Sequence, residues 1–170
     1  MEEKCASPEA DEPMKALHAF RDVSYSPFGW LHGAPNYARI VKEGFASYRD
    51  RVEAIVPENT EEEEFREGLL YVLDAMKNYA ERCREYLISI NAPKELTDAL
   101  ARVPFYPART YYEGLVAWNT VFYFDGCDNL GCLDQGLAPL YDGTDQTEVI
   151  AQLFDNIDSV NQWSCTVGGD

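Results

Sequence analysis

The sequence predicts a mainly α-helical protein with a few short strands. Apolar residues recur every three or four positions over several long stretches, which is the spacing of a helix with one buried face. These stretches begin or end at Asn, Thr or Pro, the residues that commonly mark helix boundaries. A single β-favouring run, Trp163–Val167, lies near the C-terminus and predicts strand material there.

The first part of the chain is expected to contain a tail, a loop and one helix. Residues 1–19 are predicted to form a mobile acidic tail, because they begin with a polar stretch that has no apolar period. Residues 20–35 mix aromatic side chains with Gly and Pro, which predicts an irregular loop packed on an apolar surface. A helix follows from Asn36 to Pro57, and Gly44 weakens it without excluding it.

The clearest predicted element is a helix from Thr60 to Ile90. Asn59 or Thr60 can cap it, and the acidic first turn from Glu61 to Glu64 suits the positive end of the helix dipole. At 1.5 Å per residue it would be about 45 Å long. A short helix is expected from Lys94 to Arg102, before the Val-Pro step.

The last third of the chain is predicted to hold two more helices around a long loop. Thr110 can cap a helix that ends at Phe124, and this helix is apolar on nearly all sides, as in a buried helix. Residues 125–145 carry four glycines and are expected to be irregular. A final helix is expected from Thr144 or Asp145 to Gln162.

Size, charge and cysteine content narrow the class of protein. A chain of 170 residues and 19.3 kDa is long enough for one domain with its own core. The net charge of −16 argues against nucleic acid or an anionic membrane as the main partner. The sequence has neither an apolar run of about 20 residues nor a basic and apolar leader, which predicts a cytoplasmic location. Five cysteines are an odd number, which predicts reduced thiols.

Familiar metal and catalytic motifs are not found. Cys127 and Cys132 could join Cys165 and His32 at a zinc ion, but no second pair has the spacing of a zinc motif. Residues 125–136 depart from a calcium loop at the third and last positions. Phosphate-binding loops, dinucleotide-binding glycines and the motifs of serine hydrolases and zinc proteases do not occur either. No metal site is therefore predicted.

Three stretches resemble those of the glycyl radical enzymes, the pyruvate formate-lyase-like family. Residues 103–115, VPFYPARTYYEGL, resemble V-P-x-x-P-A-R-T-F-x-E-A-L, and residues 129–141, NLGCLDQGLAPLY, resemble S-L-G-R-L-D-Q-Y-L-Y-P-Y-Y. Residues 31–44 are similar to G-H-x-x-P-D-Y-x-x-V-L-x-x-G. Residues 166–169, TVGG, lie where the family has a G-G turn. Order and spacing agree over residues 28–170, and the matched positions include Pro107, Arg109, Glu113, Gly131, Asp134, Gln135, Gly168 and Gly169.

The resemblance implies that residues 20–170 are the N-terminal portion of a ten-stranded α/β barrel enzyme. In such enzymes a glycyl radical, installed by a radical S-adenosylmethionine activating enzyme, oxidises a cysteine to a thiyl that takes hydrogen from a small-molecule substrate. The outcome is that of a lyase, a dehydratase or an acyltransferase. The long helix from Thr60 would lie outside the barrel and cover its strands. By the same resemblance, candidate substrate-pocket residues are His32, Trp163, Ser164 and Cys165.

The departures from the family argue that this chain is inert alone. Neither the thiyl loop G-C-x-E nor the radical loop R-V-x-G-Y occurs in the sequence. Residues 131–134 only imitate the thiyl loop, because their flanks match G-R-L-D-Q and place Cys132 where the family has Arg. No catalytic residue and no cofactor are therefore assigned to this chain. The alternative is a free-standing, non-catalytic helical binding protein descended from the family, and a homodimer is left open in either case.

Overall fold

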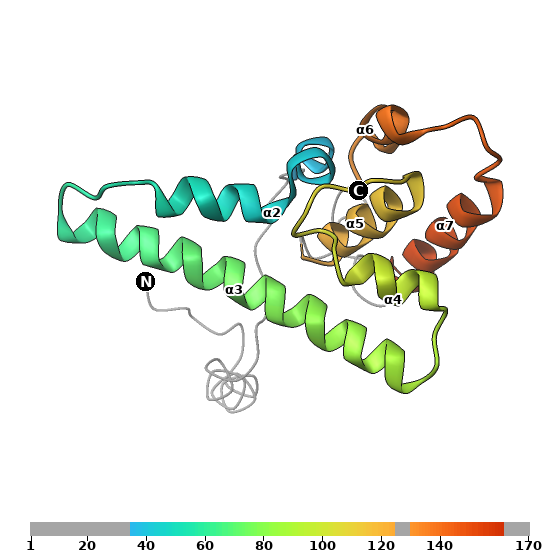
Figure 1. The fold of residues 1–170 in the computed structure, drawn as a ribbon, viewed down its shortest axis with the longest axis horizontal. Coiled ribbons are helices and arrows are strands. Elements are labelled where there is room, and N and C mark those ends of the chain that lie inside the picture. Colours follow the sequence, from blue (N-terminus) through green and yellow to red (C-terminus); the bar gives the residue numbers. More distant parts are fainter. Residues whose placement is uncertain (1–34, 125–129, 162–170) are drawn as a thin grey trace, which may run out of the picture. The chain divides into compact units, whose positions relative to one another are not determined.

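The computed structural model describes residues 35–124 and 130–161, all within one compact unit that begins at residue 32. The mainly helical class is confirmed, and the described residues contain no strand. The strand predicted at Trp163–Val167 and the tail and loop predicted before residue 35 lie outside these residues. The elements in chain order are α2 (Tyr37–Glu53), α3 (Thr60–Ser89), α4 (Lys94–Leu100), α5 (Tyr111–Phe124), α6 (Leu133–Leu137), the 3-10 helix η1 (Ala138–Leu140) and α7 (Thr147–Asn161) (Figure 1).

Helix α5 forms the centre of the core, as its apolar sequence predicts. It packs against α2, α4, α6 and α7. Trp118 on α5 and Leu137 on α6 are among the largest fully buried side chains. Fully burying a large apolar side chain contributes roughly 1.5–3 kcal/mol, so this helix carries much of the stability of the unit.

Helix α3 has the predicted start, and its inner face packs on other helices. The side chain of Asn59 accepts a hydrogen bond from the backbone N–H of Glu62, which caps the first turn. Leu73 and Met76 pack against the core, and α3 contacts α2 and α4 (Figure 1). The described residues contain no strand, so the prediction that α3 covers barrel strands stays a prediction.

The predicted helix from Asn36 to Pro57 is broken at Gly44, where the backbone has φ 73° and ψ 159°. The next two N–H groups turn away from α2 and donate to the carbonyls of Pro104 (3.0 Å) and Phe105 (2.8 Å). A Cβ at Gly44 would lie 2.3 Å from the Phe105 carbonyl oxygen, so only glycine fits this close approach. The helix then ends at Glu53, earlier than predicted.

The irregular region predicted for residues 125–145 is partly helical. It contains α6 and η1, and Leu133 and Leu137 of α6 turn toward the core. A five-residue helix offers only one repeat of the apolar spacing, so the pattern could not be recognised in the sequence. The last helix begins at Thr147 because the Asp145 carboxylate accepts the N–H and the hydroxyl of Thr147. None of the described helices combines the length and apolar content needed to cross a membrane.

Candidate functional site

The stretch from Val103 to Thr110 connects α4 to α5 and lies against α2. It begins with a cis peptide bond between Val103 and Pro104. The N–H of Ala108 donates to the carbonyl of Val41 at 2.9 Å, in addition to the bonds made near Gly44. The bond from Ala108 to Val41 joins the family-like stretch 103–115 to the family-like stretch 31–44.

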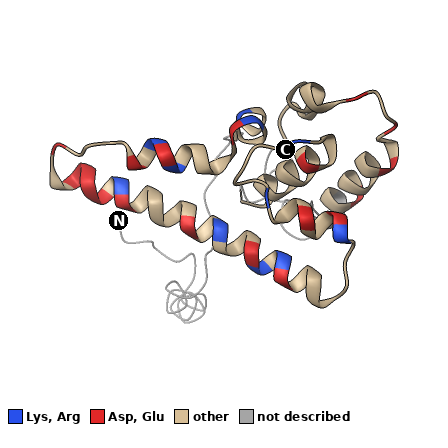
Figure 2. Ribbon diagram, in the orientation of Figure 1, with Lys and Arg blue, Asp and Glu red and all other residues tan. Residues whose placement is uncertain are grey.

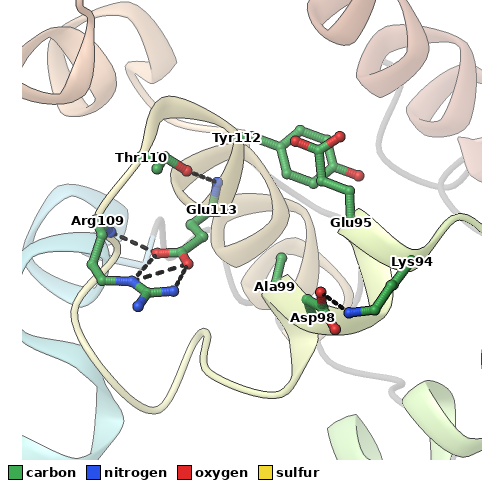
Figure 3. A pocket seen from close by; sticks show the side chains of 8 residues that line it. All are labelled: Lys94, Glu95, Asp98, Ala99, Arg109, Thr110, Tyr112 and Glu113. Carbon is green, nitrogen blue, oxygen red and sulfur yellow. Dashed lines mark hydrogen bonds and ion pairs between the residues drawn. The ribbon is translucent and has the colours of Figure 1, made fainter.

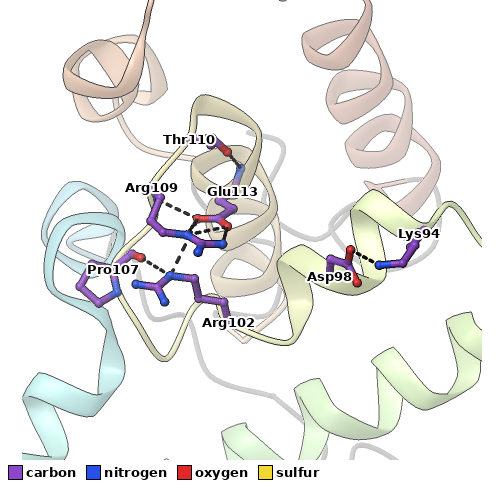
Figure 4. A network of polar contacts seen from close by, with 7 residues as sticks. All are labelled: Lys94, Asp98, Arg102, Pro107, Arg109, Thr110 and Glu113. Atoms are coloured by element: carbon purple, nitrogen blue, oxygen red, sulfur yellow. Dashed lines mark hydrogen bonds and ion pairs between the residues drawn. The ribbon is translucent and has the colours of Figure 1, made fainter.

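A buried carboxylate fixes the end of this stretch. Glu113, 6% exposed, accepts the backbone N–H of Arg109 at 2.7 Å and its guanidinium through both carboxylate oxygens (Figure 4). Arg102 lies 3.9 Å away from the same carboxylate and donates to the carbonyl of Pro107 at 2.9 Å. The hydrogen bonds from Arg109 lower the pKa of Glu113, with a smaller contribution from Arg102. Glu113 is therefore ionised at neutral pH and holds the backbone rather than carrying a proton.

The same carboxylate completes the cap of α5. The hydroxyl of Thr110 accepts the N–H of Glu113 at 3.1 Å, which confirms Thr110 as the predicted cap. The start of α3 uses the same arrangement, since Glu62 accepts the N–H of Glu58 at 2.8 Å while Asn59 caps it. In both helices a cap and a Glu three residues later satisfy backbone donors that the helix leaves free.

An aromatic pair joins the family-like stretch 129–141 to the family-like stretch 31–44. The rings of Tyr37 and Trp118 stack with centroids 4.7 Å apart and planes 8° apart. The indole N–H of Trp118 donates to the carbonyl of Leu130 at 2.8 Å. Gly131 has φ 64°, and a Cβ there would lie 3.1 Å from the ring of Tyr37. A Cβ at Gly136 would lie 2.3 Å from the ring of Trp118, so this glycine leaves room for the indole.

A surface depression of about 380 Å³ lies between α4 and the start of α5 (Figure 3). Its two cations are already paired, Lys94 with Asp98 and Arg109 with Glu113. Burial raises the pKa of Tyr112, and Glu95 raises it further, so the phenol stays protonated at neutral pH. The depression is lined by Lys94, Glu95, Asp98, Ala99, Arg109, Thr110, Tyr112 and Glu113. These groups do not form a nucleophile with an adjacent base, which covalent catalysis would need.

The structure brings only part of the predicted positions together. Arg109 and Glu113 form one contact, and Gly131 packs by the aromatic pair. Asp134 and Gln135 are exposed on α6, whereas Pro107 takes part through its carbonyl. His32, Trp163, Ser164, Cys165, Gly168 and Gly169 lie outside the described residues.

Two free thiols are among the described residues. Cys132 is exposed at the start of α6, and Cys83 is half-buried on α3. Neither lines the surface depression. Within residues 35–124 and 130–161, no three His, Cys, Asp or Glu side chains are grouped so that they could hold a metal ion.

Two residues of this site were not singled out in the sequence. Trp118 lies within the predicted apolar helix that ends at Phe124; a buried indole N–H needs an acceptor, and that need marks Trp as a candidate anchor. Arg102 is the last residue of a predicted helix, and nothing in its local spacing indicates that it approaches Glu113.

Comparison with known proteins gives no relative for this chain: no family model, no curated protein and no solved structure matches it.

Proposed function

We propose that this chain is the N-terminal helical portion of a glycyl radical enzyme, in which it serves as scaffold and does not supply the reacting groups. The observation that carries the proposal is that the family-like stretches, which are far apart in the sequence, contact one another. Ala108 bonds to Val41, and Trp118 stacks on Tyr37 while it donates to Leu130. Residues that resemble a family pattern and also hold one core together are what a shared scaffold would need.

The departures from the family pattern are compatible with this scaffold. Cys132 stands where the family has Arg, and it is exposed, so the change leaves no buried charge without a partner. Gly136 stands where the family stretch has Tyr, and Trp118 fills the volume into which a side chain there would extend. The smaller side chain at Gly136 is thus matched by the larger one at Trp118, and both lie within the described residues.

The glycyl radical would supply hydrogen abstraction from a small molecule through a cysteine thiyl, followed by cleavage or elimination. Cys132 stands where the family has Arg, and neither Cys132 nor Cys83 lines the surface depression, so no part of that step is assigned to them. The described residues would hold the connection into α5 through Arg109 and Glu113. The substrate contacts proposed for His32 and for residues 163–165 rest on the resemblance alone.

The proposal is tested on the native polypeptide, purified from the cell that encodes it. We expect an intact mass several times 19.3 kDa and a glycyl radical signal in electron paramagnetic resonance that requires an activating enzyme with S-adenosylmethionine. In that protein, His32→Ala should lower substrate turnover while the radical signal stays. A native polypeptide close to 19.3 kDa without a radical signal would refute the proposal.

A second candidate, a free-standing helical binding protein, is favoured by the self-contained core. Trp118 and Leu137, at the centre of this core, are fully buried. If the purified 170-residue chain unfolds in one cooperative transition, this candidate gains support. Aggregation, or strong binding of a dye specific for apolar surface, would favour a piece of a larger enzyme instead.

A further inference from the structure

Two arginines converge on one carboxylate where α2 is broken. The Nε–H of Arg39 donates to both carboxylate oxygens of Glu43 at 3.1 Å, and Nη1 of Arg51 donates to one of them at 2.8 Å. Arg39 lies before Gly44 and Arg51 lies after it, so these contacts span the break. In a continuous helix the two arginines would be ~18 Å apart along the axis, at ~1.5 Å per residue. The break at Gly44 therefore brings both guanidinium groups to the same carboxylate.

Both guanidinium groups also lie over the ring of Tyr48. The central carbon of Arg51 is 4.4 Å from the ring centroid, and that of Arg39 is 5.6 Å away. The ring of Tyr48 is half-buried and contacts the buried ring of Phe45, with centroids 5.8 Å apart. Because an anchored ring and cation–π contacts restrict the guanidinium planes, the two groups are positioned before a ligand arrives. Four side chains, Arg39, Glu43, Tyr48 and Arg51, form this arginine cluster.

The arginine cluster carries a net positive charge. Hydrogen bonds from Arg51 and Arg39 lower the pKa of Glu43, so its carboxylate is ionised at neutral pH. Two guanidinium groups against one carboxylate leave a charge of +1, in a chain whose net charge is −16. Figure 2 shows Lys and Arg on both sides of the break in α2, whereas the first turn of α3 is acidic. The cluster is thus a local cationic site on an acidic protein.

The two guanidinium groups retain hydrogen-bond donors. Each group has five N–H donors, and the bonds to Glu43 use one nitrogen of each. Among the residues that the structure describes, neither group has a second acceptor, and the two side chains are 47% and 46% exposed. Within the same residues Glu43 accepts no backbone N–H, unlike Glu113, which fixes the start of α5. The cluster therefore offers donors to solvent that the fold itself does not use.

We propose that the arginine cluster binds the phosphate group of a small molecule. A guanidinium group pairs with phosphate through two parallel N–H···O bonds, and two such groups can contact different oxygens of one tetrahedral phosphate. A dianion is attracted to the cluster more strongly than a monoanion. The net charge of −16 repels extended polyanions such as nucleic acid, so we expect a ligand with a single phosphate group. This inference does not depend on the proposed function.

Nuclear magnetic resonance of the ¹⁵N-labelled 170-residue chain tests the proposal, with inorganic phosphate as the probe and chloride to keep the ionic strength constant. We expect the Nε–H signals of Arg39 and Arg51 to shift along one saturation curve, with a dissociation constant in the low millimolar range. The Nε–H signal of Arg49 should not follow this curve, because its guanidinium already donates to Glu53 and Asp74. Equal shifts at all three arginines, or no shift at any of them, would overturn the proposal.

Three substitutions in α2 separate the cluster from a general effect of charge. Arg51→Gln should raise the dissociation constant for phosphate by about fivefold or more, because one of the two guanidinium groups is lost. Arg49→Gln removes the same charge from the same helix and is the matched control, which should change the constant by less than about twofold. Arg51→Lys keeps the charge without the planar fork, so its constant should lie between those of the wild type and Arg51→Gln.

Circular dichroism verifies that the three variants keep the helix content of the wild type. Equal weakening by Arg51→Gln and Arg49→Gln would overturn the proposal, because phosphate would then respond only to the total charge. Binding by Arg51→Lys as tight as that of the wild type would overturn the role of the guanidinium fork.

Discussion

Replacing Gly136 by Ala tests whether the stacked rings of Tyr37 and Trp118 anchor residues 129–141 to the core. The added Cβ would lie 2.3 Å and 2.4 Å from two ring carbons of Trp118, and the rigid indole is 1% exposed. Trp118 must then move off Tyr37 and lengthen its 2.8 Å hydrogen bond to Leu130. Overpacking costs about 1–3 kcal/mol, and a weakened buried hydrogen bond adds about 1 kcal/mol. Because Ala is the better helix former by about 1 kcal/mol and Gly136 lies in α6, we expect a net loss near 1–3 kcal/mol.

Urea unfolding followed by tryptophan fluorescence measures this loss at a concentration where the chain is monomeric. The matched control is the same substitution at Gly68, where a Cβ meets nothing within 4 Å. Gly68→Ala should stabilise the chain by about 1 kcal/mol, because Ala is the better helix former. If Gly136→Ala were neutral or stabilising, the placement of Trp118 over Gly136 would be wrong.

Three further substitutions test the cap of α5, the buried carboxylate of Glu113 and the position of Cys132, where the family has Arg. Thr110→Ala should lower the free energy of unfolding by about 1 kcal/mol, because the N–H of Glu113 loses its cap; an unchanged urea midpoint would contradict the cap. Glu113→Gln should destabilise the chain at neutral pH. Since folding lowers the pKa of Glu113, its stabilisation is present above the unfolded pKa of about 4.3 and is lost as the pH falls through the lower folded pKa. The stability gap between wild type and Glu113→Gln should therefore shrink in acid, and a gap that is constant from pH 7 to pH 3 would argue against ionisation. Cys132→Arg, which introduces the family residue at an exposed position, should leave thermal stability within about 0.5 kcal/mol.

The sequence predicts those parts of the fold that depend on local patterns. Helices α3 and α5 are long enough for several apolar repeats, and Asn59 and Thr110 cap them as expected. The break at Gly44 could not be predicted, because its cause is the backbone of Phe105, far away in the sequence. Helix α6 escaped detection because it is too short to show a period.

Some contacts of the candidate site also follow from local patterns, and others depend on the folded chain. Arg109 and Glu113 are four residues apart before and within a helix, so their contact follows from local geometry. The fit between Trp118 and Gly136 depends on two elements that meet only in the folded chain. The fold predicted for the residues beyond α7, and the substrate contacts there, stay predictions.

The break in α2 makes that helix conditional on a distant part of the chain. Both halves, on either side of Gly44, are shorter than the ~12 residues at which an isolated helix becomes even marginally stable in water. The amides of Phe45 and Ala46 have acceptors only when residues 104 and 105 are in place. Their hydrogen exchange therefore reports the docking of the α4–α5 connection, and the two segments open and close as one cooperative unit.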